Sequence, residues 1–182
     1  MTTSRPLRLP RLRIHPLLLA AVLCAAAALP TAAAANDFGL DLVIGRANQR
    51  DGDTLLAVGG NVSYLVDGWW LHPEVGYEQK LFPVFSGEDR ETTAGLRSEW
   101  PLGPRGRFFV GGGYANLRMH WGSNVEQSDG WYAHAGAMWT VGRGGFSMGV
   151  AAKMTRAPDY HPWGVTTRAG GERIGLLLSW RI

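Results

Sequence analysis

Residues 173–182 read RIGLLLSWRI, and every second side chain in this segment is apolar. The apolar set comprises Ile174, Leu176, Leu178, Trp180 and Ile182. Successive side chains of a β-strand point to opposite faces of the sheet, so the segment is predicted to be a strand with one apolar and one polar face. The given sequence ends at Ile182, and this apolar face is expected to need a cover from outside the strand. The hydrocarbon of a bilayer is one candidate for that cover.

The first 35 residues have the pattern of a secretory signal peptide. Four arginines, at positions 5, 8, 11 and 13, precede the apolar run PLLLAAVLCAAAAL, which the small-residue segment PTAAAAN follows. We place the cleavage after Ala35, so that residues 1–35 are the signal peptide and residues 36–182 form one barrel domain. Loss of these arginines leaves 14 of the 18 Lys and Arg residues against 15 Asp and Glu residues. The remaining chain is about neutral, which gives no electrostatic reason to expect nucleic-acid binding.

The remaining chain contains neither a cysteine nor a segment that could form a membrane-spanning helix. The only cysteine, Cys24, lies within the signal peptide, and no later run of 18 apolar residues occurs. The sequence therefore predicts no disulfide, no thiol site and no transmembrane helix.

Period-two alternation continues through residues 36–182 and predicts eight strands. They cover residues 37–47, 54–66, 69–82, 91–102, 107–121, 131–142, 146–156 and 172–182. Tight connections are predicted at Asp67-Gly68, PLGPRG and GRGG, and longer ones at ANQRDGDT, PVFSGEDR, SNVEQSDG and APDYHPWGVTTRAGG. Alternating short turns and long loops are typical of barrels that cross a membrane. We predict an all-β fold, an eight-stranded antiparallel up-and-down transmembrane β-barrel, with a bulge or distortion at Pro73.

Two patterns favour a lipid-facing apolar surface over the interior of a soluble, lipocalin-like barrel. Each strand has a glycine on its polar face, as a narrow interior needs: Gly39, Gly59, Gly76, Gly95, Gly112, Gly136, Gly149 and Gly175. Each strand also places an aromatic residue near its turn end on the apolar face: Phe38, Tyr64, Trp69, Trp100, Phe109, Trp139, Phe146 and Trp180. Such a ring is typical of the aromatic girdle at a membrane interface.

On these residues the chain resembles the small eight-stranded outer-membrane β-barrel proteins of Gram-negative bacteria, the OmpA/OmpX type. The terminal signal for the barrel-assembly machinery in that family is matched by Arg173, Gly175, Leu178 and Trp180, although this chain continues to Ile182 where many members end on Phe. The resemblance implies an outer-membrane location and a monomer with both termini in the periplasm. It also implies contact with outer-membrane lipid and lipopolysaccharide.

The polar face is predicted to line the barrel interior with charges of both signs. This lumen network comprises Asp41, His72, Glu74, Glu78, Lys80, Arg97, Glu99, Arg118, His120, His134, Lys153, Arg173 and Arg181. Eight strands leave no open channel, so mixed charges favour an ion-paired plug over a gated pore or a proton-linked site.

Enzymatic activity and cofactor binding have weaker support. The histidines lack the paired spacing of metal ligands, and no cofactor motif occurs. Lipid A deacylases of similar barrel size have a His-x-Ser pair, which occurs nowhere in this chain. We therefore expect a non-enzymatic protein with a structural or surface-interaction role, such as envelope integrity or adhesion. The alternatives are a small channel, a lipid A-modifying enzyme and a soluble ligand-binding barrel.

The longest predicted loop holds Tyr160, His161, Trp163 and Arg168. Aromatic residues and arginine are favoured at binding surfaces, so these four are candidate surface contacts. The alternative is that they rest on lipid headgroups or lipopolysaccharide.

Overall fold

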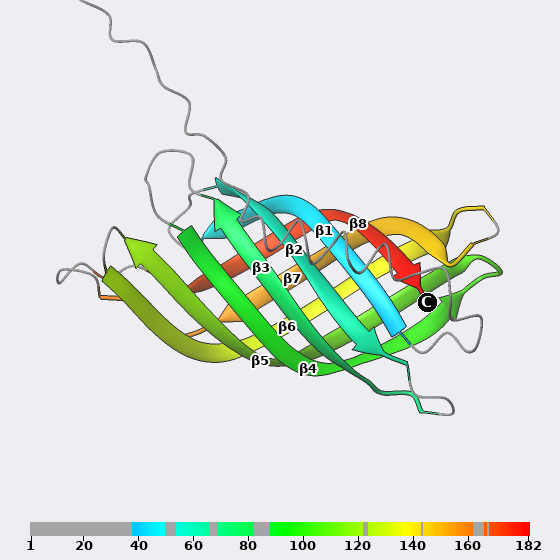
Figure 1. Ribbon diagram of the computed structural model, residues 1–182, viewed down its shortest axis with the longest axis horizontal. Coiled ribbons are helices and arrows are strands. Elements are labelled where there is room, and N and C mark those ends of the chain that lie inside the picture. Colours follow the sequence, from blue (N-terminus) through cyan, green and yellow to red (C-terminus); the bar gives the residue numbers. More distant parts are fainter. Residues whose placement is uncertain are drawn as a thin grey trace, which may run out of the picture. The chain divides into compact units, whose positions relative to one another are not determined.

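A closed barrel of eight antiparallel strands forms the described part of the chain and confirms the predicted fold class (Figure 1). The computed structural model describes residues 38–49, 54–65, 69–81, 88–121, 124–142, 144–161, 166 and 168–182. The strands are β1 (Phe38–Gln49), β2 (Thr54–Tyr64), β3 (His72–Leu81), β4 (Glu88–Leu102), β5 (Gly106–Trp121), β6 (Asn124–Thr140), β7 (Phe146–Arg156) and β8 (Gly170–Arg181). Among these residues, no helix is long and apolar enough to cross a bilayer. The predicted signal peptide lies outside the described residues.

The sheet closes where β1 pairs with β8. Backbone hydrogen bonds continue to the end of the chain, since Phe38 N donates to Ile182 O at 3.1 Å and Ile182 N donates to Phe38 O at 3.0 Å. Closure leaves no open sheet edge whose backbone groups would lack partners in lipid.

The distortion predicted at Pro73 is wrong. The pairing of β3 with β4 continues through Pro73 opposite Leu96 without a bulge. The ladder between β2 and β3 already ends at Ser63 and Glu74, one residue nearer the middle of the strand. Pro73 thus lies at the end of the sheet, where a missing N–H is tolerated.

The two ends of the barrel differ. We call the end with Phe38 and Ile182 the turn end, and the opposite end the loop end. At the loop end the predicted loop SNVEQSDG is wrong, because β6 begins at Asn124 and follows β5 after residues 122–123. At the turn end, β2 ends at Tyr64 and β3 begins at His72, so both strands are shorter than predicted. The predicted turn at Asp67-Gly68 lies outside the described residues.

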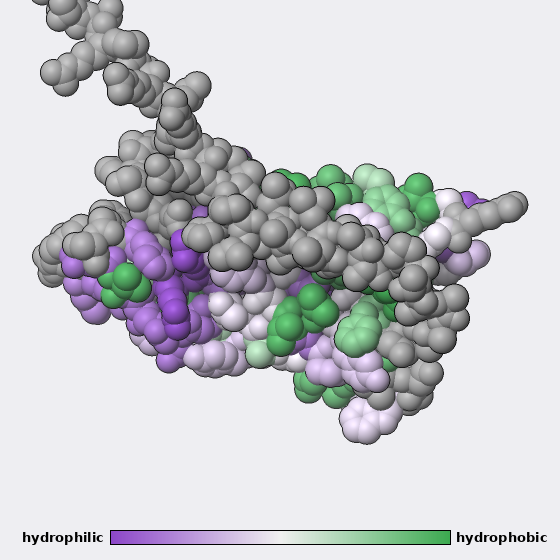
Figure 2. Space-filling view, viewed as in Figure 1, coloured by the Kyte–Doolittle hydropathy of each residue, from purple (hydrophilic) through white to green (hydrophobic). Residues whose placement is uncertain are grey.

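A belt of apolar side chains surrounds the turn-end part of the wall. The exposed members include Phe38, Ile44, Val62, Tyr64, Val75, Leu96, Trp100, Phe108, Val110, Tyr114, Trp131, Trp139, Val150, Ile174 and Leu176. Aromatic rings meet across neighbouring strands, with centroids 5.1 Å apart in the pairs Phe38–Tyr64 and Phe146–Trp180. Figure 2 shows that hydrophilic residues gather instead towards the loop end, over β4 and β5. The wall therefore has the polarity of a membrane-spanning barrel.

One strand, β5, has the opposite parity from the prediction. Phe109 is buried with 1% of its surface exposed, whereas Phe108 is 40% exposed and stacks on Trp100 with centroids 5.8 Å apart. Phe108 takes the girdle position predicted for Phe109. On the same outward face lie Gly112, Arg118 and His120, so their predicted interior positions are wrong.

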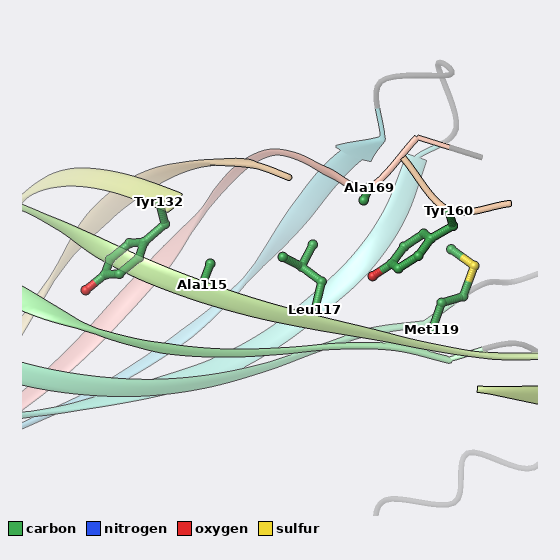
Figure 3. Close-up of a cluster of buried hydrophobic side chains, with 6 residues drawn as sticks. All are labelled: Ala115, Leu117, Met119, Tyr132, Tyr160 and Ala169. Atoms are coloured by element: carbon green, nitrogen blue, oxygen red, sulfur yellow. The ribbon is translucent and has the colours of Figure 1, made fainter. Parts of the chain in front are cut away.

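The interior is apolar at the loop end and largely ionic nearer the middle. Leu117 and Met119, which point inwards from β5, pack with Ala115, Tyr132, Tyr160 and Ala169 (Figure 3). Beyond the apolar belt, the wall therefore has the usual arrangement of a soluble protein, with apolar residues inside and polar residues outside.

Candidate functional site in the barrel interior

Acidic and basic side chains face each other from opposite walls of the barrel. On one wall Glu78 of β3 is the cross-strand partner of Glu91 of β4. On the other wall Lys153 of β7 is the cross-strand partner of Arg173 of β8. Like charges directly opposite on neighbouring strands repel, so each wall depends on the other for compensation.

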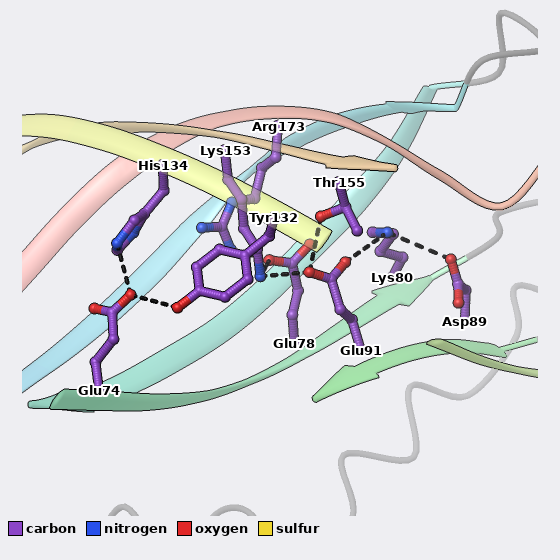
Figure 4. Close-up of polar contacts among 10 residues, drawn as sticks. All are labelled: Glu74, Glu78, Lys80, Asp89, Glu91, Tyr132, His134, Lys153, Thr155 and Arg173. Atoms are coloured by element: carbon purple, nitrogen blue, oxygen red, sulfur yellow. Dashed lines mark hydrogen bonds and ion pairs between the residues drawn. The ribbon is translucent and has the colours of Figure 1, made fainter. Parts of the chain in front are cut away.

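The four charges meet in the middle of the lumen (Figure 4). Lys153 Nζ lies 2.6 Å from Glu91 Oε1 and 3.7 Å from Glu78 Oε2, and Arg173 forms an ion pair with Glu78. Thr155 Oγ1 also donates to Glu91 Oε1 at 2.9 Å. These contacts tie β3 and β4 to β7 and β8 across the barrel.

Lys80 continues the network towards the loop end. Its Nζ lies 3.2 Å from Glu91 Oε2 and 3.4 Å from Asp89 Oδ2. Asp89 and Glu91 each have only 1% of their surface exposed, so the ammonium group compensates two carboxylates that are removed from bulk water.

A hydrogen-bonding group around the carboxyl of Glu74 lies nearer the turn end. Tyr132 donates to Glu74 Oε1 at 2.7 Å, and His134 Nε2 lies 2.7 Å from the same oxygen. A glycine makes room for this histidine, since a Cβ on Gly111 would overlap His134 Nε2.

Arginines close the network at the turn end. Arg97 forms ion pairs with Asp41 and with Glu99, the latter at 2.8 Å, and Glu99 also pairs with Arg181. The guanidinium of Arg97 lies 4.0 Å above the ring centre of Phe109. The inward position of Phe109 therefore has a specific role, because it covers a buried cation.

A short segment after β7 packs against the apolar cluster at the loop end. Tyr160 is only 2% exposed and packs into the apolar cluster of Leu117 and Met119. Two hydrogen bonds from β6 hold the segment, since Ser128 Oγ donates to Pro158 O at 2.6 Å and Glu126 Oε2 accepts from His161 N at 2.8 Å. Burial, followed by the charges of Asp89 and Glu91, raises the pKa of the Tyr160 hydroxyl, which therefore stays neutral.

The candidate surface contacts do not form one group. Tyr160 faces the interior, so its prediction as a surface contact is wrong. His161 and Arg168 are exposed. Trp163 lies outside the described residues.

Most of the predicted lumen residues face inwards. Those in the ionic network are Asp41, Glu74, Glu78, Lys80, Arg97, Glu99, His134, Lys153, Arg173 and Arg181. His72 is half-buried near the turn end. Arg118 and His120 are the two that the structure places on the outer wall. In the predicted assembly signal, Arg173 and Gly175 face inwards, and Leu178 and Trp180 lie on the opposite, outward face. Recognition of this segment stays a prediction.

Three charged residues were missed. Asp89 and Glu91 have the same parity as Arg97, so extending the alternation backwards along β4 would have found them. Arg107, whose Nη1 lies 4.0 Å from Glu99, was missed because the parity of β5 was assigned wrongly.

The arrangement is suited to filling space with compensated charge. Within the described part of the chain, no group of three or more His, Cys, Asp or Glu residues is placed to hold a metal ion. The interior instead joins side chains from β1, β3, β4, β6, β7 and β8 in ion pairs and hydrogen bonds. Such a barrel is a transmembrane β-barrel with a packed, ion-paired lumen.

Comparisons with known proteins support the fold. No family model matches the sequence, and no curated protein matches it. In structure the chain is similar to Neisserial surface protein A, with a TM-score of 0.61 and 10% identity over 80% of this chain and 96% of that one. It is also similar to the N-terminal β-barrel domain of Pseudomonas aeruginosa OprF, with a TM-score of 0.58 and 14% identity over 81% of this chain and 98% of that one. The chain therefore has the fold of the small eight-stranded outer-membrane β-barrels.

Proposed function

We propose that the protein is an integral outer-membrane protein with a structural or surface-interaction role. The apolar belt and the closed sheet support the membrane location, because lipid can cover both without unpaired backbone groups. The N-terminal segment with the pattern of a signal peptide provides a route into the envelope. The fold of the two similar barrels agrees with this location.

The observation that carries the role is the set of ion pairs across the lumen. Lys153 and Arg173 reach from one wall to Glu78 and Glu91 on the other, and Tyr160 packs into the apolar cluster near the loop end. A substrate or ion that passed through the lumen would have to break several buried ion pairs. Each charge left without a partner would cost much free energy. A lumen that ion pairs cross in this way supports a role of the barrel wall or of the loops rather than transport.

Cell fractionation tests the location. Membranes washed with carbonate should retain the protein, and the folded barrel should migrate anomalously on gels until it is boiled. Recovery in the soluble periplasmic fraction would contradict the proposal and favour a soluble ligand-binding barrel.

A deletion strain tests the role. We expect increased detergent sensitivity or reduced adhesion, restored by the wild-type chain, with unchanged lipid A composition. A change in lipid A acylation that the wild-type chain restores would instead support an enzyme.

A further inference from the structure

Five polar side chains from five successive strands line the lumen at the turn end. They are Glu99 of β4, Arg107 of β5, Thr140 of β6, Ser147 of β7 and Arg181 of β8, each within three residues of the turn end of its strand. Arg107 Nη2 donates to Ser147 Oγ at 3.0 Å, and the hydroxyl groups of Ser147 and Thr140 are 3.3 Å apart. We call these five residues the turn-end mouth.

Arg107 is the most weakly compensated cation of the turn-end mouth. Both carboxylate oxygens of Glu99 are already engaged, Oε1 by Arg97 at 2.8 Å and Oε2 by Arg181. Arg107 Nη1 lies 4.0 Å from Oε2, which is too far for a hydrogen bond. Because Nη2 of Arg107 donates to the neutral hydroxyl of Ser147, the charge of this guanidinium has no close carboxylate partner in the mouth.

Positive charge is in excess at the turn-end mouth. Three arginines share two carboxylates in the ion pairs of this region, which join Arg97, Arg107, Arg181, Asp41 and Glu99. The next carboxylate inwards belongs to Glu74, whose contacts are with Tyr132 and His134. His72, which is half-buried near the turn end, can add only positive charge.

The excess charge can be reached from outside the barrel. The side chains of Arg107 and Arg181 are 20% and 26% exposed, whereas those of Lys153 and Arg173 in the middle of the lumen are 6% and 5% exposed. A ligand from the turn end would therefore meet Arg107 without breaking the ion pairs deeper in the lumen. Partial burial also strengthens the attraction between this cation and an anion relative to bulk water.

The chemistry of the mouth favours a carboxylate. Arginine presents several N–H donors in a plane that matches the two oxygens of a carboxylate. A carboxylate brings one negative charge, which balances the one arginine in excess, whereas a phosphate group brings about 1.5 to 2 negative charges. The buried hydroxyl of Ser147 holds Arg107 in place for such a contact.

We propose that the turn-end mouth binds a carboxylate of an acidic peptide segment, and that Arg107 makes the main contact. This rests on the proposed function, in which the turn end faces the periplasm. It gives the structural role a partner class, namely a periplasmic protein with an acidic segment that reaches the end of the barrel.

The test measures binding of an acidic peptide to the folded protein in detergent. A labelled peptide of alternating glutamate and glycine, amidated at its C-terminus, is titrated against the wild type, Arg107→Gln and a matched control, Arg105→Gln. Arg105 is exposed in the adjacent turn between β4 and β5, so its replacement changes the net charge equally. We expect Kd to rise about tenfold for Arg107→Gln, as for one lost charge-assisted hydrogen bond, and less than about twofold for the control.

Five results would overturn the assignment. No binding to the wild type would show that the mouth takes no such peptide, and equal losses in both variants would show that only net charge matters. Equal affinity for the matching glutamine peptide would show that the carboxylate is not recognised. Displacement of the peptide by an equal concentration of inorganic phosphate would show a site for free phosphate. Tighter binding by Asp37→Asn would show that the carboxylate of Asp37, which directly precedes β1 and lies outside the described residues, fills the mouth.

Two controls keep these outcomes separate from other failures. All variants should keep the heat-dependent gel migration of a folded barrel. A soluble location in cells would defeat the proposed function independently of the measured affinities.

Discussion

At the scale of single residues, the interior depends on positions that have no side chain at all. Gly111 faces inwards from β5, where a Cβ would overlap His134 Nε2 and lie 2.9 Å from the backbone oxygen of Leu96. The imidazole occupies this space and reaches Glu74 on the other wall. Alternation of small and large residues is how a narrow barrel is filled.

Gly111→Ala should therefore destabilise the barrel by about 1–3 kcal/mol, the usual cost of overpacking a filled interior. Gly144→Ala is the matched control, because a Cβ there meets no atom within 4 Å, and it should change stability by less than about 0.5 kcal/mol. Reversible unfolding of both variants in lipid vesicles measures the difference. Equal stabilities would show that His134 does not occupy the space in front of Gly111.

Charge compensation can be tested at the same scale. Arg173→Gln removes an ion pair from Glu78 and leaves Lys153 3.7 Å away, so it should cost about 3 kcal/mol, as for a broken buried pair. The double variant with Glu78→Gln should be more stable than the sum of the two single losses by at least about 1 kcal/mol. Additive losses would show that the two side chains do not interact.

At the scale of the element, β5 shows where sequence reasoning works and where it fails. The other strands have one apolar and one polar set, so their parity follows from alternation alone. In β5 the pairs Phe108–Phe109 and Gly111–Gly112 offer an aromatic and a glycine to either face. The register of β5 with β4 decides which of these residues face inwards. That register is set by pairing in the sheet, so it cannot be read from β5 alone.

The loop-end half of β5 misled the prediction for a second reason. Arg118 and His120 were assigned to the lumen because polar residues face inwards within a bilayer. This strand extends past the apolar belt, where water surrounds the wall and Leu117 and Met119 turn inwards. The same change explains why the polar segment before Trp131 resembled a loop although it is a strand.

Charges placed along the outer face of β5 test its parity. Val110→Arg puts a cation in the apolar belt and should cost about 2–4 kcal/mol of unfolding free energy in vesicles. Asn116→Arg, on the same face but beyond the belt, should cost about 0–1 kcal/mol. A harmless Val110→Arg would indicate that this position faces the lumen.

The segment with Tyr160 is an element whose stability can be measured locally. Tyr160→Ala removes its largest buried side chain and should open the segment, so hydrogen exchange of residues 157–161 should accelerate at least tenfold. His161→Ala, which changes an exposed side chain, should leave the exchange within about twofold, as is usual for surface substitutions. Equal exchange in both variants would contradict the role of Tyr160 as the anchor.

At the scale of the whole molecule, the two faces of the sheet meet different requirements of a membrane protein: the outer face must suit lipid, and the inner face must compensate buried charges. The outer face carries an apolar belt suited to lipid, and ion pairs between opposite walls lie within the inner face together with apolar clusters. The fold class and most inward-facing charges follow from the sequence, because a period of two assigns each residue to a face. The ion-pair partners across the lumen cannot be predicted from the sequence, because they depend on which strands lie opposite each other once the barrel has closed.

Conductance across a planar bilayer tests the central claim most directly, namely that the lumen is a closed, ion-paired plug. The wild-type protein, inserted into the bilayer at moderate voltage, should give no stable current steps, or only rare small events. Glu78→Gln, which leaves Lys153 and Arg173 facing each other, should increase the frequency of such events. Large, reproducible and ion-selective steps from the wild type would contradict the plug and support a channel.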